Sequence, residues 1–134
     1  MKHFTWIITC LSILLLVACG KKDEPKEHPG DVAQQYINYL IKGDYSNFIG
    51  GFSSIQNLNG DERNQITVLL KHYGQLEKEK NGGLKSAEVL KERISENGKK
   101  AEVTFRFVYN NRQVEETVFG MVLEKGKWKL DLKK

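Results

Sequence analysis

The sequence predicts an α+β domain in which N-terminal helices pack on a curved four-stranded antiparallel meander. Between residues 31 and 80, apolar side chains recur at the three- and four-residue spacing of helices. From residue 84 onward they alternate with polar ones, as in strands that bury one face. No proline follows Pro29, and turn sequences rich in glycine and asparagine separate the expected strands. This order indicates helices and then strands around one core.

The first helix is expected to run from Asp31 to Lys42. Asp31 has the side chain of an N-cap, and Gly43 provides the C-terminal stop. The apolar side chains fall on one face of this helix, so it should cover the core. They are Val32, Tyr36, Ile37, Leu40 and Ile41.

Two further helices precede the strands. A short one is expected over residues 44–52. A longer one begins at Asn59, which forms the pattern of a capping box with Glu62, and runs to about Lys80. The Asn-Gly-Gly sequence at 81–83 ends it. Its apolar side chains are Ile66, Leu69, Leu70, Tyr73 and Leu76.

The first hairpin is predicted at Asn97-Gly98, a strong signal for a two-residue turn. This turn sets Ile94 opposite Ala101 and Leu90 opposite Phe105. We call the sheet face toward the helices the inner face. On the second strand it carries Val103, Phe105, Phe107 and Tyr109.

Two more turns assign the faces of the last strands. A two-residue turn near Asn110-Asn111 places Val114, Glu116, Val118, Gly120 and Val122 on the inner face. A two-residue Lys125-Gly126 turn would then put Trp128 and Leu130 on the opposite face. We therefore expect a three-residue loop over residues 124–126, with Gly126 in the left-handed conformation, which keeps Trp128 inside.

Residues 1–18 predict a secretion signal. Lys2 gives a positive start, and residues 6–17 form an apolar run that is too short to span a bilayer comfortably. The sequence Leu16-Val17-Ala18-Cys19 resembles the lipobox of bacterial lipoproteins. The resemblance implies that Cys19 becomes the lipid attachment site, with palmitate among its acyl chains.

The remaining chain divides into a linker and one domain. Residues 19–30 hold both prolines and few apolar side chains, so after Cys19 we expect a flexible tether. Residues 31–134 form the single α+β domain. We expect a lipid-anchored protein of the bacterial cell envelope, at the outer membrane if the cell is Gram-negative. Lys21-Lys22-Asp23-Glu24 is either a surface-export signal or a merely solvated part of the tether.

Cysteine and histidine usage excludes several chemistries. Cleavage before Cys19 removes Cys10 and leaves no free thiol, which excludes disulfides, thiolate zinc sites and a cysteine nucleophile. His72 is the only histidine within residues 31–134, so a two-histidine metal site cannot form there. We expect no cofactor and no metal. The net charge of +4 is spread through Glu-Lys mixtures, which argues against nucleic-acid binding.

Two segments resemble a known family. They are DVAQQYINYLIKGDYSNF and AEVTFRFVYNNRQVEETVFGMVLEKGKWKLDL. Both are similar to the small lipoproteins of the DUF4878 group, a domain of unknown function with a cystatin-like or NTF2-like fold. The likeness implies a conical cavity between helices and sheet. It implies no catalytic residues that could be transferred to this chain.

Cavity chemistry is one hypothesis for the function. Glu88, Glu92 and Glu116 share the predicted inner face, and burial would raise a carboxyl pKa toward that of a general base. We single out Glu116, with Tyr36 and Trp128 as the other candidate cavity residues. The competing interpretation is an edge position or a solvated cavity mouth for Glu116.

Binding through the outer sheet face is the other hypothesis. The predicted outer face carries Phe119, Met121 and Leu123 among charged residues, which is typical of a contact surface for a homodimer or an envelope protein. Cover by the long third helix and its connection is the alternative. We expect a non-enzymatic binding or interaction module, with cavity-based ligand binding or acid/base catalysis through Glu116 as the alternative. A purely structural envelope role is a third possibility.

Overall fold

The computed structural model describes residues 27–131. Four helical segments come first: α2 (Pro29–Ile41), α3 (Tyr45–Ile49), the 3-10 helix η1 (Ile55–Asn57) and α4 (Gly60–Asn81). The strands are β1 (Leu84–Ile94), β2 (Lys100–Tyr109), β3 (Val114–Glu124) and β4 (Lys127–Asp131). They pair in the order β1-β2-β3-β4, and every pair is antiparallel. This confirms the α+β class and the meander. The predicted signal peptide and Cys19 lie outside the described residues.

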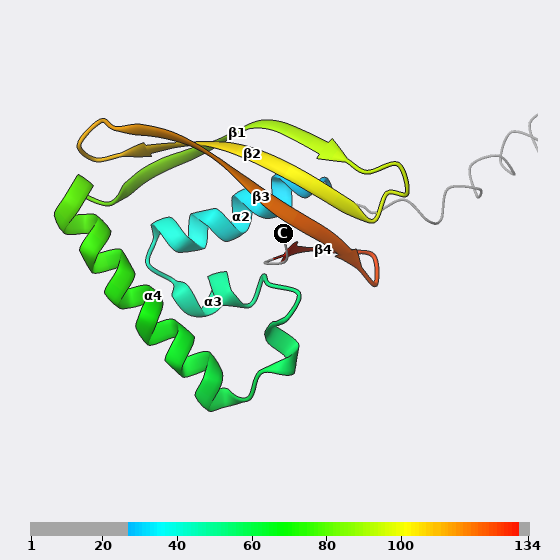
Figure 1. Cartoon of the computed structure of the whole chain (residues 1–134), viewed down its shortest axis with the longest axis horizontal. Helices are drawn as coiled ribbons and strands as arrows, with labels where there is room; N and C mark the ends of the chain where they lie inside the picture. The colour runs from blue at the N-terminus through cyan, green and yellow to red at the C-terminus, as the bar shows by residue number, and fades with distance from the viewer. Residues whose placement is uncertain (1–26, 132–134) are drawn as a thin grey trace, which may run out of the picture.

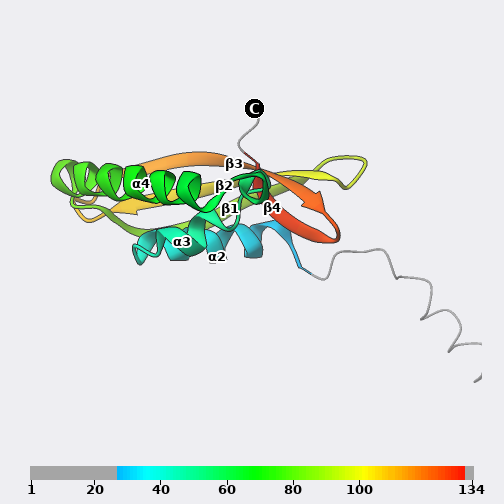
Figure 2. The same cartoon turned by 90° about the horizontal axis from the view of Figure 1, so that it is seen from below.

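The helices are arranged unequally around the sheet. α2 packs against β1, β2 and β4, and α3 lies beside α2. α4 packs against the short α3, and its C-terminal end meets the start of β1 (Figure 1). Figure 2 shows α2 and α3 together on one side of the sheet, and α4 packs against α3 rather than beside α2 along the sheet. One long helix therefore stands away from the core.

The first turn of α2 is capped from the sheet. The helix begins at Pro29, whose fixed φ suits a first helical position, with His28 as N-cap. The His28 side chain caps nothing, and the Gly30 N–H instead donates to Glu92 Oε2 of β1 at 2.8 Å. The prediction of Asp31 as N-cap was therefore wrong. Pro29 and Gly30 are buried and form the start of α2.

Local signals at the end of α2 and at both ends of α4 are confirmed, whereas α3 ends at Ile49 rather than at the expected residue 52. The Asn59 side chain accepts from the Glu62 N–H at 2.9 Å, and Glu62 Oε2 accepts from the Asn59 N–H at 3.0 Å, which is the predicted capping box. Gly43 follows α2 with a φ of 75°, and Gly82 ends α4 with a φ of 80°. Both are left-handed positions that favour glycine.

The first hairpin has the predicted turn but a bulged first strand. Ile94 pairs with Ala101 as expected. A register shift between Val89 and Lys91 then places Val89, rather than Leu90, opposite Phe105. A bulge adds one residue to its strand, so the side chains beyond it change faces. Glu88 consequently pairs with Arg106 away from the inner face, whereas Glu92 stays on it.

The second hairpin has an odd number of loop residues, and this corrects the face of β3. Tyr109 and Gln113 close a three-residue loop, whose last residue, Arg112, has a φ of 74°. The expected two-residue turn was wrong. Because side chains alternate along a strand, the one-residue difference turns over the whole of β3. Its inner face carries Glu115, Thr117, Phe119, Met121 and Leu123.

The third hairpin corrects a second loop length. Lys125 and Gly126 form a two-residue turn with φ values of 51° and 77°, and Glu124 pairs with Lys127. Positive φ at both positions is the type I′ pattern that suits hairpins. The predicted three-residue loop was wrong. The two loop errors cancel, so Trp128 is on the inner face as expected.

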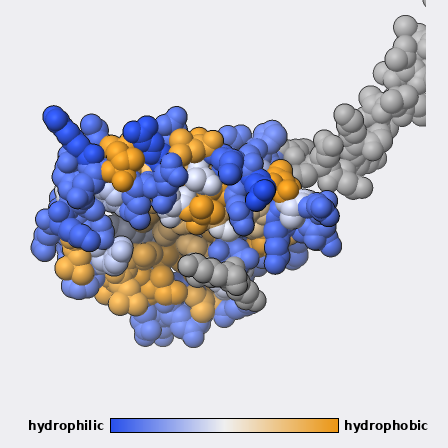
Figure 3. All heavy atoms as spheres, turned by 45° about the horizontal axis from the view of Figure 1, so that its top comes forward, coloured by the Kyte–Doolittle hydropathy of each residue, from blue (hydrophilic) through white to orange (hydrophobic). Residues whose placement is uncertain are grey.

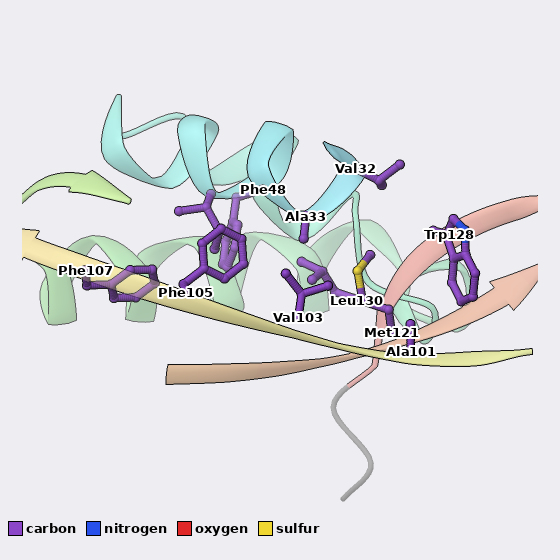
Figure 4. Close-up of a cluster of buried hydrophobic side chains, with 11 residues drawn as sticks. Val32, Ala33, Phe48, Ala101, Val103, Phe105, Phe107, Met121, Trp128 and Leu130 are labelled. Carbon is purple, nitrogen blue, oxygen red and sulfur yellow. The ribbon is translucent and has the colours of Figure 1, made fainter. Parts of the chain in front are cut away.

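The core lies between α2, α3 and the inner face of the sheet. Figure 4 shows the buried side chains of both layers pointing toward one another. Phe105 is fully buried at the centre, and its ring contacts Phe119 edge to face with 5.7 Å between centroids. Trp128 is 3% exposed, and its Nε1 has no hydrogen-bond partner within the described part of the chain. The indole therefore stabilises the fold by packing alone.

Truncating Trp128 should separate packing from hydrogen bonding. We expect Trp128→Ala to lower the free energy of unfolding by about 3–5 kcal/mol, because it leaves a large cavity in the core. Trp128→Phe should cost much less, since it keeps a ring and removes an unsatisfied donor. Urea denaturation of both variants measures the difference, and equal losses would show that the indole N–H has a partner.

Glu92 should matter more than its neighbour Glu88. We expect Glu92→Ala to lower the free energy of unfolding by about 1 kcal/mol, because the first turn of α2 loses its cap. Glu88→Ala, on the same strand but outside the inner face, should change it by less than about 0.5 kcal/mol. Thermal denaturation measures both variants. A Glu88→Ala variant as unstable as Glu92→Ala would contradict the capping role.

Candidate functional site

A cleft of about 890 Å³ opens between α4 and the inner face of the sheet. It lies at the end of the sheet where β1 begins and the β2–β3 hairpin turns, beside the C-terminal end of α2. Figure 3 shows a face of the molecule on which apolar atoms surround a hollowed area. This cleft combines a sizeable volume with apolar walls, and we treat it as the candidate site.

The deep walls of the cleft are mainly apolar. They combine Leu40 and Ile41 from the end of α2, Leu70 from α4, Leu84 from β1 and Phe107 from β2. All five belong to the hydrophobic core or pack against it. The cleft is therefore an opening into the edge of the core, so an apolar group placed there would leave water.

The cleft exists because α4 is held only at a few points. Near its start, the Arg63 guanidinium donates to the Ile55 carbonyl at 2.9 Å. In its middle, the Tyr45 hydroxyl lies where a Cβ of residue 74 would be, so Gly74 permits the close approach. Between these points the helix stands off from the sheet. Its apolar side chains are mostly exposed, with Leu69 at 67% and Leu76 at 50%.

The end of α4 is locked to the β2–β3 hairpin. Asn81, which is 5% exposed, donates from Nδ2 to Glu77 Oε2 at 2.7 Å and accepts from the Gly83 N–H at 2.9 Å. Its carbonyl accepts from the Asn111 N–H at 3.0 Å. Asn110 Nδ2 donates to the Gly82 carbonyl at 2.7 Å. These bonds hold together two walls that are far apart in the sequence.

Two tyrosines and two carboxylates meet at the polar side of the cleft. The Tyr109 hydroxyl donates to Glu115 Oε2 at 2.8 Å. Burial raises the pKa of Tyr109 far above its ordinary value, and so do the bond to Glu115 and the negative charges of Glu115 and Glu77. The electrostatic influence of Tyr73 acts in the same direction. All four side chains line the cleft.

The predicted cavity residues are not brought together. Glu116 pairs with Arg106 on the outer face, so its expected inner position was wrong. Tyr36 packs against Gly51, and burial, followed by Tyr39 and Glu27, raises its pKa. Trp128 is in the core. None of the three lines the cleft.

The predicted interface residues belong to the inner face. Met121 is 1% exposed, and Phe119 and Leu123 are partly buried against the core. Placing this trio on an exposed outer face was wrong, because the odd loop at residues 110–112 turns β3 over. The outer face instead exposes Val114 and Val118, at 50% and 58%.

Sequence reasoning missed the residues that line the polar side. Part of this polar side could have been predicted from the four-residue spacing of Tyr73, Glu77 and Asn81, which places these residues on one side of a helix. Tyr109 and Glu115 could be found only once the hairpin loop is known to hold three residues.

The site offers no recognisable catalytic set. Neither histidine nor serine lines the cleft. Within residues 27–131, no group of three His, Cys, Asp or Glu side chains could hold a metal ion. In the same range, no helix combines the length and apolar character needed to cross a membrane.

Comparison with known proteins supports the fold. No model of a protein family matches the chain, and no curated protein matches it. A crystal structure described as a candidate NTF2-like transpeptidase from Campylobacter jejuni is similar, with a TM-score of 0.62 and 16% sequence identity. The likeness covers 80% of this chain and 100% of that one. At this identity it shows an NTF2-like fold and nothing about activity. Membership of the DUF4878 group stays a prediction.

The contact between Tyr109 and Glu115 predicts a response to alkaline pH. A tyrosine whose folded pKa is raised contributes stability that is fully present below its unfolded value of 10.0 and is lost as pH rises through the folded value. We expect Glu115→Gln to lower the pKa of Tyr109, because the negative charge is removed. Titration of tyrosinate absorbance measures this, with Glu116→Gln as the control. Identical titrations of wild type and Glu115→Gln would contradict the contact.

Proposed function

We propose that this protein is a non-enzymatic binding module that holds an apolar small molecule in the cleft between α4 and the sheet. The observation that carries the proposal is the cleft itself, about 890 Å³ in volume and open to solvent beside apolar walls. Small-molecule sites typically measure a few hundred to about 1,000 Å³ and combine apolar walls with a few polar groups. The cleft has this size and composition.

The chemistry of the lining supports binding over catalysis. Covalent or acid/base catalysis requires a nucleophile within reach of a base, and that base is oriented by a third group. The titratable groups of the cleft are tyrosines, glutamates and lysines, and the one specific pair among them is the bond from Tyr109 to Glu115. In that bond the phenol of Tyr109, whose pKa is raised, donates to the carboxylate, which is an arrangement for recognition.

The transpeptidase description of the structural neighbour does not transfer readily to this cleft. An enzyme that exchanges peptide bonds needs an attacking group for the carbonyl carbon. The cleft residues include neither cysteine nor serine, and none of the hydrogen bonds among the lining residues joins Thr117 to a base. This lining supports the proposal of binding rather than peptide-bond exchange.

The proposed setting is the bacterial envelope, with the domain anchored through lipid on Cys19. The tether would join the domain at the start of α2, whereas the cleft lies at the end of that helix. A helix of 13 residues is about 20 Å long, so the cleft would lie about that far from the tethering point. This separation keeps the opening accessible above a membrane surface.

Filling the cleft should abolish binding of a neutral apolar probe. We expect N-phenyl-1-naphthylamine, whose fluorescence rises in apolar surroundings, to bind wild type with one-to-one stoichiometry. Thr117→Trp places an indole in the cleft and should weaken binding by at least about tenfold, or 1.4 kcal/mol. Fluorescence titration measures both affinities.

Thr104→Trp is the matched control, because Thr104 pairs with Val118 on the outer face. It should bind the probe as wild type does. Absence of probe binding to wild type would contradict the proposed function, and so would equal weakening by the two tryptophan variants. Circular dichroism confirms that each variant is folded.

A further inference from the structure

We propose that the cleft selects small amphiphilic amines, with the apolar body against the deep walls and the ammonium group between Tyr73, Tyr109, Glu77 and Glu115. This inference rests on the proposed function, since it names the class of ligand for the same cleft. The aromatic rings and the two carboxylates support this inference, because neither carboxylate has an ion-pair partner within residues 27–131.

The aromatic groups come from both walls. Tyr73 lies on α4 and is 62% exposed, while Tyr109 ends β2 on the inner face. Tyrosine rings attract an ammonium group through the negative charge of their faces, most strongly where water is excluded. Rings on opposite walls at the mouth of an apolar cleft are well suited to hold an organic cation.

The two carboxylates are incompletely used by the protein. Glu77 Oε2 accepts from Asn81, and Glu115 Oε2 accepts from Tyr109. Both donors are neutral, and within residues 27–131 no hydrogen bond reaches either Oε1. In the part of the chain from residue 27 to residue 131, the single ion pair joins His28 and Glu92. The negative charges of Glu77 and Glu115 therefore have no ion-pair partner there.

The lysines beside the cleft do not fill this role. Lys78 and Lys80 line the cleft on the same helix as Glu77, yet neither forms an ion pair with either glutamate. The Lys78 backbone and Cβ lie toward Gly83, at the locked end of α4. An incoming ammonium could therefore form the ion pair that neither carboxylate has within residues 27–131. A carboxylate ligand would meet like charge and be disfavoured.

A displacement experiment tests the inference with three probes of equal chain length. Octylammonium, 1-octanol and octanoate each compete with N-phenyl-1-naphthylamine for the wild-type cleft, below the concentrations at which they aggregate. We expect octylammonium to displace the probe at about a tenfold lower concentration than 1-octanol, and octanoate to be the weakest. Equal displacement by octylammonium and 1-octanol would overturn the inference while leaving apolar binding intact.

Matched variants locate the effect. Glu115→Gln keeps a hydrogen-bond acceptor for Tyr109 and should reduce the preference for octylammonium several-fold without changing the affinity for 1-octanol. Glu77→Gln should do the same. Glu116→Gln removes an equal charge from the adjacent residue on the outer face and should leave the preference unchanged. A loss of preference as large with Glu116→Gln as with Glu115→Gln would overturn the inference.

The outcomes for the two proposals are distinguishable. If wild type binds none of the neutral compounds, the proposed function fails, whatever octylammonium does. If neutral compounds bind and octylammonium shows no advantage, only the amine selectivity fails. Nα-acetyl-lysine N-methylamide, whose free side-chain ammonium is carried on a peptide unit, completes the set. Weaker displacement by it than by octylammonium supports a free amine, whereas stronger displacement would overturn that choice.

Discussion

The hydrogen-bonded corner between the end of α4 and the β2–β3 hairpin determines most of this structure. Asn110 donates to the Gly82 carbonyl, and Asn111 donates to the carbonyl of Asn81. These bonds hold a loop with an odd number of residues, and the parity of that loop decides which side chains of β3 face the helices. The same corner joins two walls of the cleft. Core, outer face and candidate site thus depend on one junction.

The parts of the fold that follow from neighbouring residues could be predicted from the sequence. The capping box of Asn59 and Glu62 and the left-handed Gly43 and Gly82 depend on short-range geometry, and they are confirmed. Features that depend on distant residues could not. The cap of α2 comes from Glu92, which is 62 positions away from Gly30. The bulge at residue 90 and the loop at residues 110–112 also depend on contacts with residues that are distant in the sequence.

The candidate site was less predictable than the fold because a single register step separates Glu115 from Glu116. Both are glutamates on one strand, and alternation assigns one to the cleft and the other to solvent. Glu116 was predicted to face the cleft because two loop lengths were each expected wrongly by one residue. The two errors cancelled at Trp128, so the predicted pattern was consistent. The position of α4 relative to the sheet could not be predicted either, because it depends on the contact between the Tyr45 hydroxyl and Gly74. Apolar spacing alone made this helix look buried.

The face of β3 is the central claim, and thiol accessibility tests it most directly. In chains with Cys10 and Cys19 replaced by serine, a single cysteine is introduced at Val118 or at Met121, and its reaction with a maleimide is followed by mass spectrometry. Val118 is 58% exposed and Met121 is 1% exposed. We expect rapid labelling of Val118→Cys and protection of Met121→Cys under native conditions. Protection of Val118→Cys together with rapid labelling of a folded Met121→Cys would contradict the account.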